Sequence, residues 1–367
     1  MTYPTLMTHP ISIEATVAEQ LVHDLVAIPS YSREEQPAVT FLVDWFTQHD
    51  YTQAFVDAAG NAVGIVGEGD GSEDVILLGH IDTFPGKPTV KIEGRNLYGR
   101  GSVDAKSPLC TFAVATLQAK HLLQPNQRLI VVGAVEEECA TSKGAHYVAT
   151  QYQPQVCIIG EPSHWDRMTL GYKGRLMLQW YWEGALAHSA GEQPTAAERA
   201  FAYWDRVQAY VATFNSERTS IFGRLDASIR DLNTGTLHGG THQWARMAIG
   251  FRLPPDLHPS QVEAVLHDRH AQLTSSSHEL TYVAEKDNVL TRAFRSAIRH
   301  HEGTPRFLYK TGTSDMNVVG PVWNCPIVAY GPGDAALDHT PDEHLDLDEY
   351  HQAIQVLTDT LALLLEN

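Results

Sequence analysis

The amino-terminal part of the chain contains two segments in which apolar residues recur at helical spacing. These segments cover residues 17–26 and 39–46, and the first pattern ends at Pro29. Two short, continuously apolar runs follow at residues 62–66 and 75–78, each bounded by glycine or acidic residues. Short apolar runs of this kind are typical of buried strands. The pattern therefore predicts two helices followed by two strands.

The alternation of strand and helix continues along the chain. Residues 106–123 have helical periodicity, and residues 129–135 and 156–159 are two further continuous apolar runs. Alternating strands and helices form a mainly parallel sheet with helices on both faces, in which ligands bind beyond the carboxyl ends of the strands. The predicted fold class is therefore α/β.

The pattern changes after about residue 171. An alternating strand at 176–182 and a long amphipathic helix at 195–214 indicate a compact α+β insert, and helix–strand alternation resumes with the helix at 289–301. A chain of 367 residues is long for a single hydrophobic core. We expect one α/β domain formed by 1–171 and 287–367, interrupted by a smaller α+β domain at 172–286.

Composition indicates which classes of partner the protein can bind and in which cellular compartment it works. The formal net charge of −18 disfavours binding to nucleic acid and to anionic membrane surfaces. The amino terminus has no basic region followed by an apolar run, and no stretch approaches the roughly 18 apolar residues of a membrane span. The four cysteines are scattered, which indicates reduced thiols rather than a disulfide framework. We expect a cytoplasmic protein.

The first candidate residues for chemistry lie next to predicted strand and helix ends. His80 and Asp82 follow the strand at 75–78 and, two residues apart in extended backbone, face the same side, although for this pair alone a polar strand end is the simpler explanation. Asp104 stands between a glycine-rich turn and a helix, where it could also cap the helix. Position 104 lacks the third glycine of a Gly-x-Gly-x-x-Gly fingerprint, which argues against nucleotide binding.

More acidic residues and a second histidine complete the set. Three consecutive glutamates, 136–138, follow an apolar strand, Glu161 follows another, and His339 lies in a carboxyl-terminal loop. Carboxylates gathered at one sheet edge repel each other unless a cation or proton compensates their charge. Mixed imidazole and oxygen ligands suit zinc, manganese or cobalt rather than calcium, and an excess of carboxylates suits two metal ions.

In this order, these segments resemble the zinc-dependent family that includes acetylornithine deacetylase, succinyl-diaminopimelate desuccinylase, aminoacylases and glutamate carboxypeptidase. The resemblance covers essentially the whole chain. It implies a metal-dependent hydrolase of linear amides with two Zn²⁺ ions per subunit, for which Co²⁺ can substitute. Position by position it implies the following roles: His80 and Glu161 bind one zinc, Asp104 bridges both, Glu138 and His339 bind the second, Asp82 orients His80, and Glu137 is the general base.

The run of three glutamates allows a second alignment. The family motif is an acidic residue followed by Glu-Glu, and we align Glu136 with the first position because Gly144-Ala145 then falls at the spacing that some members show. In the alternative alignment both roles move back by one, so that Glu136 is the base and Glu137 the ligand.

The resemblance also implies that 1–171 and 287–367 form the catalytic domain and that the α+β insert at 172–286 is a lid or dimerisation domain. His188 stands where relatives carry a histidine that reaches the active site of the partner subunit and helps to hold the oxyanion. This role implies a homodimer. The alternative is that His188 is one of the 19 histidines that simply lie at the surface.

Within the family, the chain is most similar to the hydrolases that release lysine or ornithine from an amino-group carrier protein of LysW type, formerly described as N-acetyl-lysine deacetylases. That branch acts in lysine and arginine biosynthesis and cleaves the amide between the carrier's terminal glutamate side chain and the α-amino group of lysine or ornithine. The motifs that carry this likeness are Gly79–Thr83, Gly133–Glu138, Ser142–Ala145, Gly171–Arg175 and Lys310–Asn317.

The implied carrier is acidic, and a chain of charge −18 would repel it unless basic residues gather near the cleft. The candidates for such a patch and for binding the substrate carboxylate are Arg167, Lys173, Arg175 and Lys310. A solvated surface charge is the alternative for each of them.

Two other functions remain open. One is a deacetylase or dipeptidase acting on a small free N-acyl amino acid such as N-acetylornithine. The other is a non-catalytic, metal-stabilised binding protein, which the presence of both Glu137 and Asp82 disfavours. Hydrolysis by a serine nucleophile is disfavoured because the chain has no Gly-x-Ser-x-Gly motif.

Overall fold

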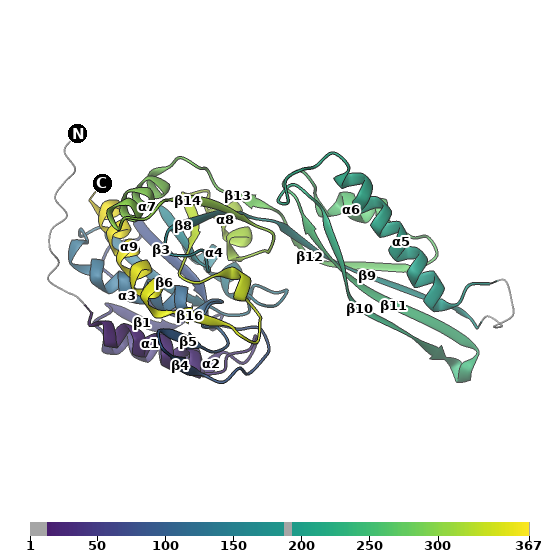
Figure 1. The fold of residues 1–367 in the computed structure, drawn as a ribbon, viewed down its shortest axis with the longest axis horizontal. Helices are drawn as coiled ribbons and strands as arrows, with labels where there is room; N and C mark the ends of the chain where they lie inside the picture. Colours follow the sequence, from purple (N-terminus) through teal and green to yellow (C-terminus); the bar gives the residue numbers. More distant parts are fainter. Residues whose placement is uncertain (1–12, 187–192, 367) are drawn as a thin grey trace. The chain divides into compact units, whose positions relative to one another are not determined.

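The computed structural model describes residues 13–186 and 193–366, which form two compact units (Figure 1). The first unit comprises the chain up to Leu170, residues Ala284–Leu308 and the chain from Val318 onwards. The second unit comprises Gly171–Val283 and Tyr309–Asn317. None of the helices in the described part of the chain is long and apolar enough to cross a membrane.

A nine-stranded sheet has most of its residues in the first unit, in the order β1-β2-β6-β3-β7-β15-β8-β13 with β14 paired to β8, and its strand β13 belongs to the second unit. Its four central strands are parallel: β6 (Gln127–Ala134), β3 (Glu73–His80), β7 (Val156–Gly160) and β15 (Ile327–Tyr330). The antiparallel neighbours on one side are β1 (Gln53–Val56) and β2 (Ala62–Val66). Those on the other side are β8 (Arg167–Tyr172) and β13 (Tyr282–Val283), and β14 spans Arg306–Lys310. The sheet is thus mainly parallel at its centre, as predicted.

Both faces of the central sheet are buried. In β3, Val75 and Leu77 belong to a large apolar cluster, whereas Ile76 and Leu78, which point to the other face, are also fully buried. The helices with residues in that cluster are α1 (Ala15–Ala27), α2 (Gln36–Gln48), α3 (Lys106–Ala119), α7 (Val289–His300) and α9 (Leu347–Leu365). Two further α-helices are α4 (Lys143–Gln151), which follows β6, and α8 (Asp315–Trp323), whose first three residues belong to the second unit.

Helix α3 packs closely against the carboxyl ends of the central strands because these strands carry glycine there. Gly79 and Gly160 are paired across β3 and β7. A Cβ atom on Gly160 would lie 2.9 Å from Gly79 Cα and 3.0 Å from the Phe112 ring. A larger residue would therefore displace the helix from the strand ends.

A small three-stranded sheet joins two segments that are far apart in the sequence. Its order is β16-β5-β4, with β16 at His344–Asp346, β5 at Asn96–Tyr98 and β4 at Lys91–Glu93. The antiparallel pairing of β16 with β5 brings the residues just before β16 next to the turn that follows β5.

The second unit is a four-stranded antiparallel sheet in the order β10-β11-β9-β12 with helices on one face. The strands are β9 (Gly174–Ala185), β10 (Asp226–Leu237), β11 (His242–Leu253) and β12 (Gln272–Glu279), and the helices are α5 (Ala196–Asn215) and α6 (Pro259–Leu266). Alternate residues of β9 and β11, including Trp180 and Phe251, are buried with both helices in one apolar cluster. A capping box of Thr195 and Glu198 starts α5 where the sequence predicted a helix.

One segment belongs to a different unit from the one that the sequence pattern indicated. Residues 309–317 were expected in the catalytic domain, yet they pack with the second unit. The Asn317 side-chain amide donates hydrogen bonds to the carbonyl oxygens of Tyr172, Lys173 and Leu280, and Arg252 Nη1 donates to Thr313 Oγ1. These side-chain contacts, which hydrophobic periodicity does not report, hold the segment there.

Candidate metal centre

Parallel strands deliver three of the predicted residues to one edge of the sheet. His80 is the last residue of β3 and is paired with Ala134, the last residue of β6. Gly160 ends β7 beside Gly79, so Glu161 follows immediately on the neighbouring strand. The register of three strands, rather than any single motif, therefore places His80, the loop after β6 and Glu161 together.

Asp104, Glu138 and His339 form a cluster at this edge. Each offers one ligand atom, and these atoms all lie within 4.8 Å of one another. His339 Nε2 is 3.0 Å from Asp104 Oδ2 and 3.1 Å from Glu138 Oε1. The loop that follows β6, the turn before α3 and the loop before β16 thus meet at one point.

The two oxygens of Asp104 face different histidines. Oδ1 lies 3.3 Å from His80 Nε2, whereas Oδ2 lies 3.0 Å from His339 Nε2. The possibility that Asp104 caps helix α3 is not realised, because the capping position is Ala105 and no side chain caps the helix. A carboxylate that presents one oxygen to each imidazole has the arrangement of a bridging ligand.

The orientation of His80 follows from its second ring nitrogen. Nδ1 lies 2.9 Å from the carbonyl oxygen of Asp82, which can only accept, so Nδ1 carries the proton and donates. The Asp82 carboxylate is farther from Nδ1, at 3.6 Å. Nε2, which faces Asp104, is therefore the nitrogen that can bind a metal ion once the imidazole is neutral.

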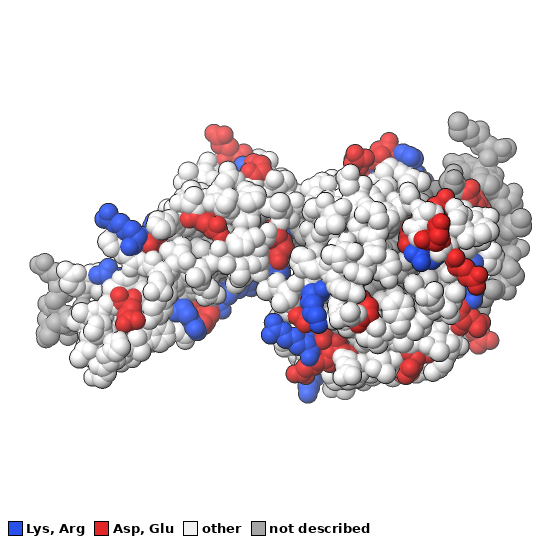
Figure 2. All heavy atoms as spheres, turned by 180° about the vertical axis from the view of Figure 1, so that it is seen from behind, with Lys and Arg blue, Asp and Glu red and all other residues white. Residues whose placement is uncertain are grey.

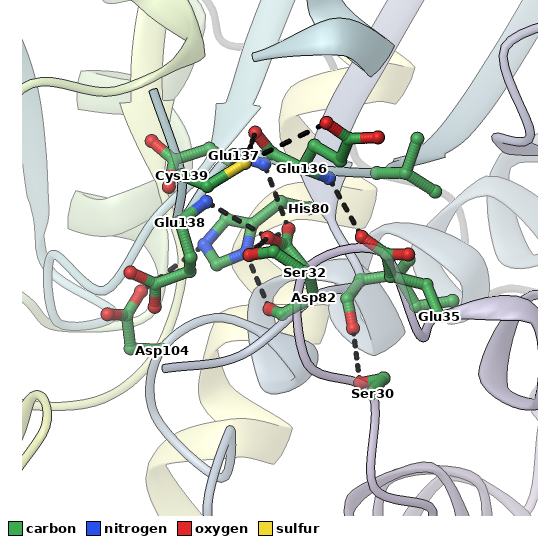
Figure 3. Close-up of polar contacts among 12 residues, drawn as sticks. Ser30, Ser32, Glu35, His80, Asp82, Asp104, Glu136, Glu137, Glu138 and Cys139 are labelled. Atoms are coloured by element: carbon green, nitrogen blue, oxygen red, sulfur yellow. Dashed lines mark hydrogen bonds and ion pairs between the residues drawn. The ribbon is translucent and has the colours of Figure 1, made fainter. Parts of the chain in front are cut away.

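Asp82 also shapes the glutamate loop (Figure 3). Its buried carboxylate accepts hydrogen bonds from the backbone N–H groups of Glu137 and Glu138, both at 3.0 Å, and from Ser32 Oγ at 2.7 Å. One residue thus fixes His80 through its carbonyl group and the two glutamates through its carboxylate.

The side chains of the three consecutive glutamates interact with different residues. The Glu136 carboxylate accepts a hydrogen bond from Thr141 Oγ1 and lies 3.8 Å from Arg33 Nε. The Glu138 carboxylate instead contacts His339. Glu136 adopts φ +63°, a left-handed conformation that is uncommon for residues other than glycine and that turns the chain sharply here. Between them, the negative charge of Glu137 acts on His80.

Both histidines hold protons tightly. Burial opposes protonation of His80, but hydrogen bonds with Asp104 and Asp82 outweigh it and raise the pKa of the imidazole well above its usual value. Hydrogen bonds with Asp104 and Glu138 raise the pKa of His339 to about 10, against the opposing effect of burial. Protonated histidines therefore supply positive charge to this cluster of carboxylates.

The carboxylates respond in opposite directions. Burial favours the neutral form of Asp104, but hydrogen bonds with His339 and His80 prevail and hold its pKa far below the usual range. Burial, together with the charge of Asp104, raises the pKa of Glu138. Protons on the two imidazoles thus help to balance the charges of the carboxylates around them. Such a set of imidazole and carboxylate donors fits divalent metal ions.

The predicted substrate-binding cations are mostly in contact with carboxylates of their own unit. Lys173 is fully buried, and its ammonium group donates to the Arg224 carbonyl oxygen at 2.7 Å and to Asp226 at 2.6 Å. Arg175 pairs with Glu279 at 3.2 Å. In the first unit, Arg167 pairs with Asp166 at 3.3 Å.

The two other residues with predicted substrate-binding or catalytic roles are Lys310 and His188. Lys310 Nζ lies 5.9 Å from the centre of the Tyr172 ring, within the second unit. His188 lies outside the described residues.

The sequence did not single out Arg100 and Glu343. Glu343 is fully buried, pairs with Arg100 and accepts hydrogen bonds from the backbone of Val103 and Asp104. This pair could have been predicted only from the pairing of β5 with β16, which brings the loop before β16 next to the turn after β5. Strands of three residues are too short for their hydrophobic pattern to predict such a pairing.

Comparison with known proteins agrees with this geometry. The profile of peptidase family M20/M25/M40 matches residues 76–363. The LysW-lysine hydrolase of Deinococcus radiodurans is 46% identical over 359 residues, covering 96% of this chain and 98% of that protein. The LysW-lysine/LysW-ornithine hydrolase of Saccharolobus solfataricus is 27% identical over 349 residues, covering 94% of this chain and 95% of that protein.

A solved structure shows the same fold. The YXEP protein of Bacillus subtilis, a dinuclear metal-binding peptidase of the M20 family, matches with a TM-score of 0.67 over 96% of this chain and 98% of its own, at 13% identity. The family profile spans well over half of the chain, and the Deinococcus relative aligns with it almost from end to end. The chain therefore belongs to peptidase family M20/M25/M40.

Proposed function

We propose that this protein hydrolyses the amide that joins lysine, or ornithine, to the γ-glutamyl end of a LysW-type amino-group carrier protein. The observation that carries the proposal is the 46% identity to a LysW-lysine hydrolase over 96% of the chain. The metal-dependent amide chemistry of the family suits the cluster of histidines and carboxylates at the sheet edge.

We assign a centre of two zinc ions, for which cobalt can substitute, to five side chains. His80 and Glu161 would hold one ion, Glu138 and His339 the other, and Asp104 both. The opposed oxygens of Asp104 support this division, because each faces a different histidine. When bound, such ions supply Lewis acidity towards water and towards the amide carbonyl group.

Glu137 is the general base of the proposal. It takes a proton from the attacking water and returns it to the nitrogen of the leaving lysine. The contact between Glu138 and His339 supports the alignment in which Glu138 is the ligand and Glu137 the base, because the Glu136 carboxylate bonds to Thr141 instead. Asp82 positions both His80 and the backbone of this loop.

The substrate's carboxylate groups require cations, for which we propose Lys173, Arg175 and Lys310 of the second unit. Lys173 and Arg175 already bind Asp226 and Glu279, so a substrate carboxylate would share or replace those ion pairs. An acidic carrier would gain from such cations because the chain as a whole carries a formal charge of −18.

The proposal extends to a cytoplasmic homodimer in which His188 reaches the partner's active site and helps to hold the oxyanion. Phe201 on helix α5 is 56% exposed, as expected for an apolar side chain that a partner covers. All four cysteines lie among the described residues and none forms a disulfide, in keeping with a reducing compartment.

The test measures hydrolysis of three substrates by the zinc-loaded protein: N-acetyl-lysine, N-acetylornithine and a LysW-type carrier ending in γ-glutamyl-lysine. We expect kcat/KM to be highest for the carrier. Comparable values for all three would rule out carrier specificity and favour a small-substrate deacetylase. Loss of activity with a chelator and recovery with zinc or cobalt separates metal-dependent hydrolysis from a binding protein, which would hydrolyse none of the substrates.

A further inference from the structure

An ion pair outside the proposed ligand set connects two of the ligand-bearing loops. Arg100, in the turn after β5, pairs with Glu343, which lies just before β16. The Glu343 side chain is fully buried and the Arg100 side chain is 10% exposed, so this pair is shielded from water. Shielded pairs with hydrogen bonds to fixed backbone groups hold their geometry better than surface pairs.

Each partner reaches the backbone of one proposed metal ligand. The Oε1 atom of Glu343 accepts hydrogen bonds from the N–H groups of Val103, at 3.0 Å, and Asp104, at 3.2 Å. Arg100 Nη2 donates to the carbonyl oxygen of His339 at 3.3 Å. The ion pair therefore fixes the relative position of the backbones that carry Asp104 and His339.

Other contacts reinforce the same connection. The Gly99 N–H group donates to the Glu343 carbonyl oxygen at 3.2 Å, and β5 pairs with β16 directly beyond it. The His339 ring stacks on Phe84 with ring centres 4.2 Å apart. His339 nevertheless adopts φ +62°, so its loop needs external contacts to keep this conformation.

The other half of the site is held differently. His80 ends a strand hydrogen-bonded on both sides, and Glu161 directly follows the neighbouring strand. We propose that Arg100 and Glu343 are positioning residues for the Asp104–Glu138–His339 half of the centre. This proposal rests on the metal centre of the proposed function. Loss of either residue weakens metal binding in that half and leaves the His80–Glu161 half less affected.

The test titrates metal-stripped protein with Co²⁺ and follows its visible absorption together with the bound metal content. The variants are Glu343→Gln, which keeps an oxygen for the two backbone N–H groups but removes the charge, and Arg100→Gln. We expect one of the two Co²⁺ affinities to fall about 10- to 100-fold in each variant, as for residues that orient metal ligands, with a smaller change in the other.

Asp74→Asn is the matched control. Asp74 is a buried carboxylate that binds Arg128 through two hydrogen bonds of 2.7 and 2.6 Å, at the opposite end of β3 in the same unit. This variant loses a comparable ion pair, and its thermal unfolding and two Co²⁺ affinities show what general destabilisation alone does. Arg100→Lys, which retains the charge, should recover part of the lost affinity.

The possible results separate the inference from the proposed function. If wild-type protein binds two Co²⁺ ions and both Glu343→Gln and Arg100→Gln bind them equally well, the inference fails and the proposed function stands. Equal weakening of both sites, or the same pattern in Asp74→Asn, also overturns the inference. Absence of Co²⁺ binding by the wild-type protein would overturn the proposed metal centre itself.

Discussion

The candidate metal centre and the second unit balance the charges of their carboxylates in different ways. In the second unit, Lys173 and Arg175 each pair with a carboxylate of that unit. In the first unit, the Asp104 and Glu138 side chains contact histidines, whose protons are the balancing charge. A buried carboxylate needs a compensating positive charge, and a proton on histidine can give way to a metal ion at the same position.

The distribution of charge along the chain follows the same division. Residues 171–283 and 309–317 hold 11 lysines and arginines and 12 aspartates and glutamates, so nearly all of the net charge of −18 belongs to the first unit. On the face drawn in Figure 2, acidic and basic side chains are interspersed rather than segregated. Excess negative charge therefore belongs to the unit that contains the candidate metal centre, where cations have a place to bind.

The largest expected effect comes from Glu137→Gln. Loss of the general base should lower kcat by about 10²- to 10⁴-fold while both metal ions remain bound. The measurement is steady-state hydrolysis of the carrier amide together with metal content. Glu136→Gln is the matched control and should remain active. If Glu136→Gln is the inactive variant and Glu137→Gln loses metal, the roles move back by one residue.

A smaller loss is expected for Asp82→Asn. The asparagine has a single acceptor oxygen, so it cannot accept from Glu137, Glu138 and Ser32 as the carboxylate does. Metal affinity, measured by competition with a chelator, should fall about 10- to 100-fold. Ser32→Ala removes only one of these donors and should have the milder effect. Unchanged affinity in Asp82→Asn would show that the backbone alone holds the ligands.

Removal of the metal should make the protein sensitive to alkaline pH. The pKa of His339 is raised to about 10 in the folded protein, above its ordinary value of 6.5. Its contribution to stability is therefore fully present below about pH 6.5 and is lost as the pH rises towards 10. We expect the Tm of stripped protein to fall over this window more than that of zinc-loaded protein.

The proton on His339 can also be followed by its release when the metal binds. Zinc binding at pH 8 should release protons because neutral imidazole is the ligand, and calorimetry in buffers of different ionisation enthalpy measures that release. A titration without proton release would mean that His339 is already neutral in the stripped protein.

The smallest effect on the metal centre is expected from Lys173→Met in the second unit. This substitution leaves the Arg224 carbonyl oxygen and Asp226 without their shared donor. We expect a loss of about 1–3 kcal/mol in unfolding free energy by chemical denaturation, with metal content unchanged. Arg246→Met, which breaks an exposed pair with Asp231, should cost less. Loss of metal in Lys173→Met would contradict the expectation that Lys173 stabilises only its own unit.

The sequence predicts the strands and the residues at their ends better than it predicts the links between loops. The strand at 62–66 is observed with those bounds, and His80 ends β3 as the apolar run before it indicated. Such runs are readable because a buried strand must be apolar on both faces. Helices α4 and α8 were not predicted, because in short segments apolar residues are too few to define a period.

The resemblance implied a set of ligands, but the connection between the loops that carry them became visible only in the structure. In the sequence, Arg100 is one residue of a glycine-rich turn, and Glu343 resembles any acidic residue of a polar loop. Their pairing joins positions 243 residues apart. Ion pairs of this kind leave no periodic trace in either segment, because a single buried glutamate has the same sequence context as an exposed one.

The pairing of β5 with β16 also affects when the site can form during synthesis. Asp104 and Glu138 are made early, whereas His339 and β16 follow the entire second unit. Domains begin to fold while the chain is still being made, so the early carboxylates spend that time without their later partners. A nascent chain that ends before residue 339 therefore cannot form the complete proposed centre, so that metal binding by all of its ligands would be one of the last steps in maturation.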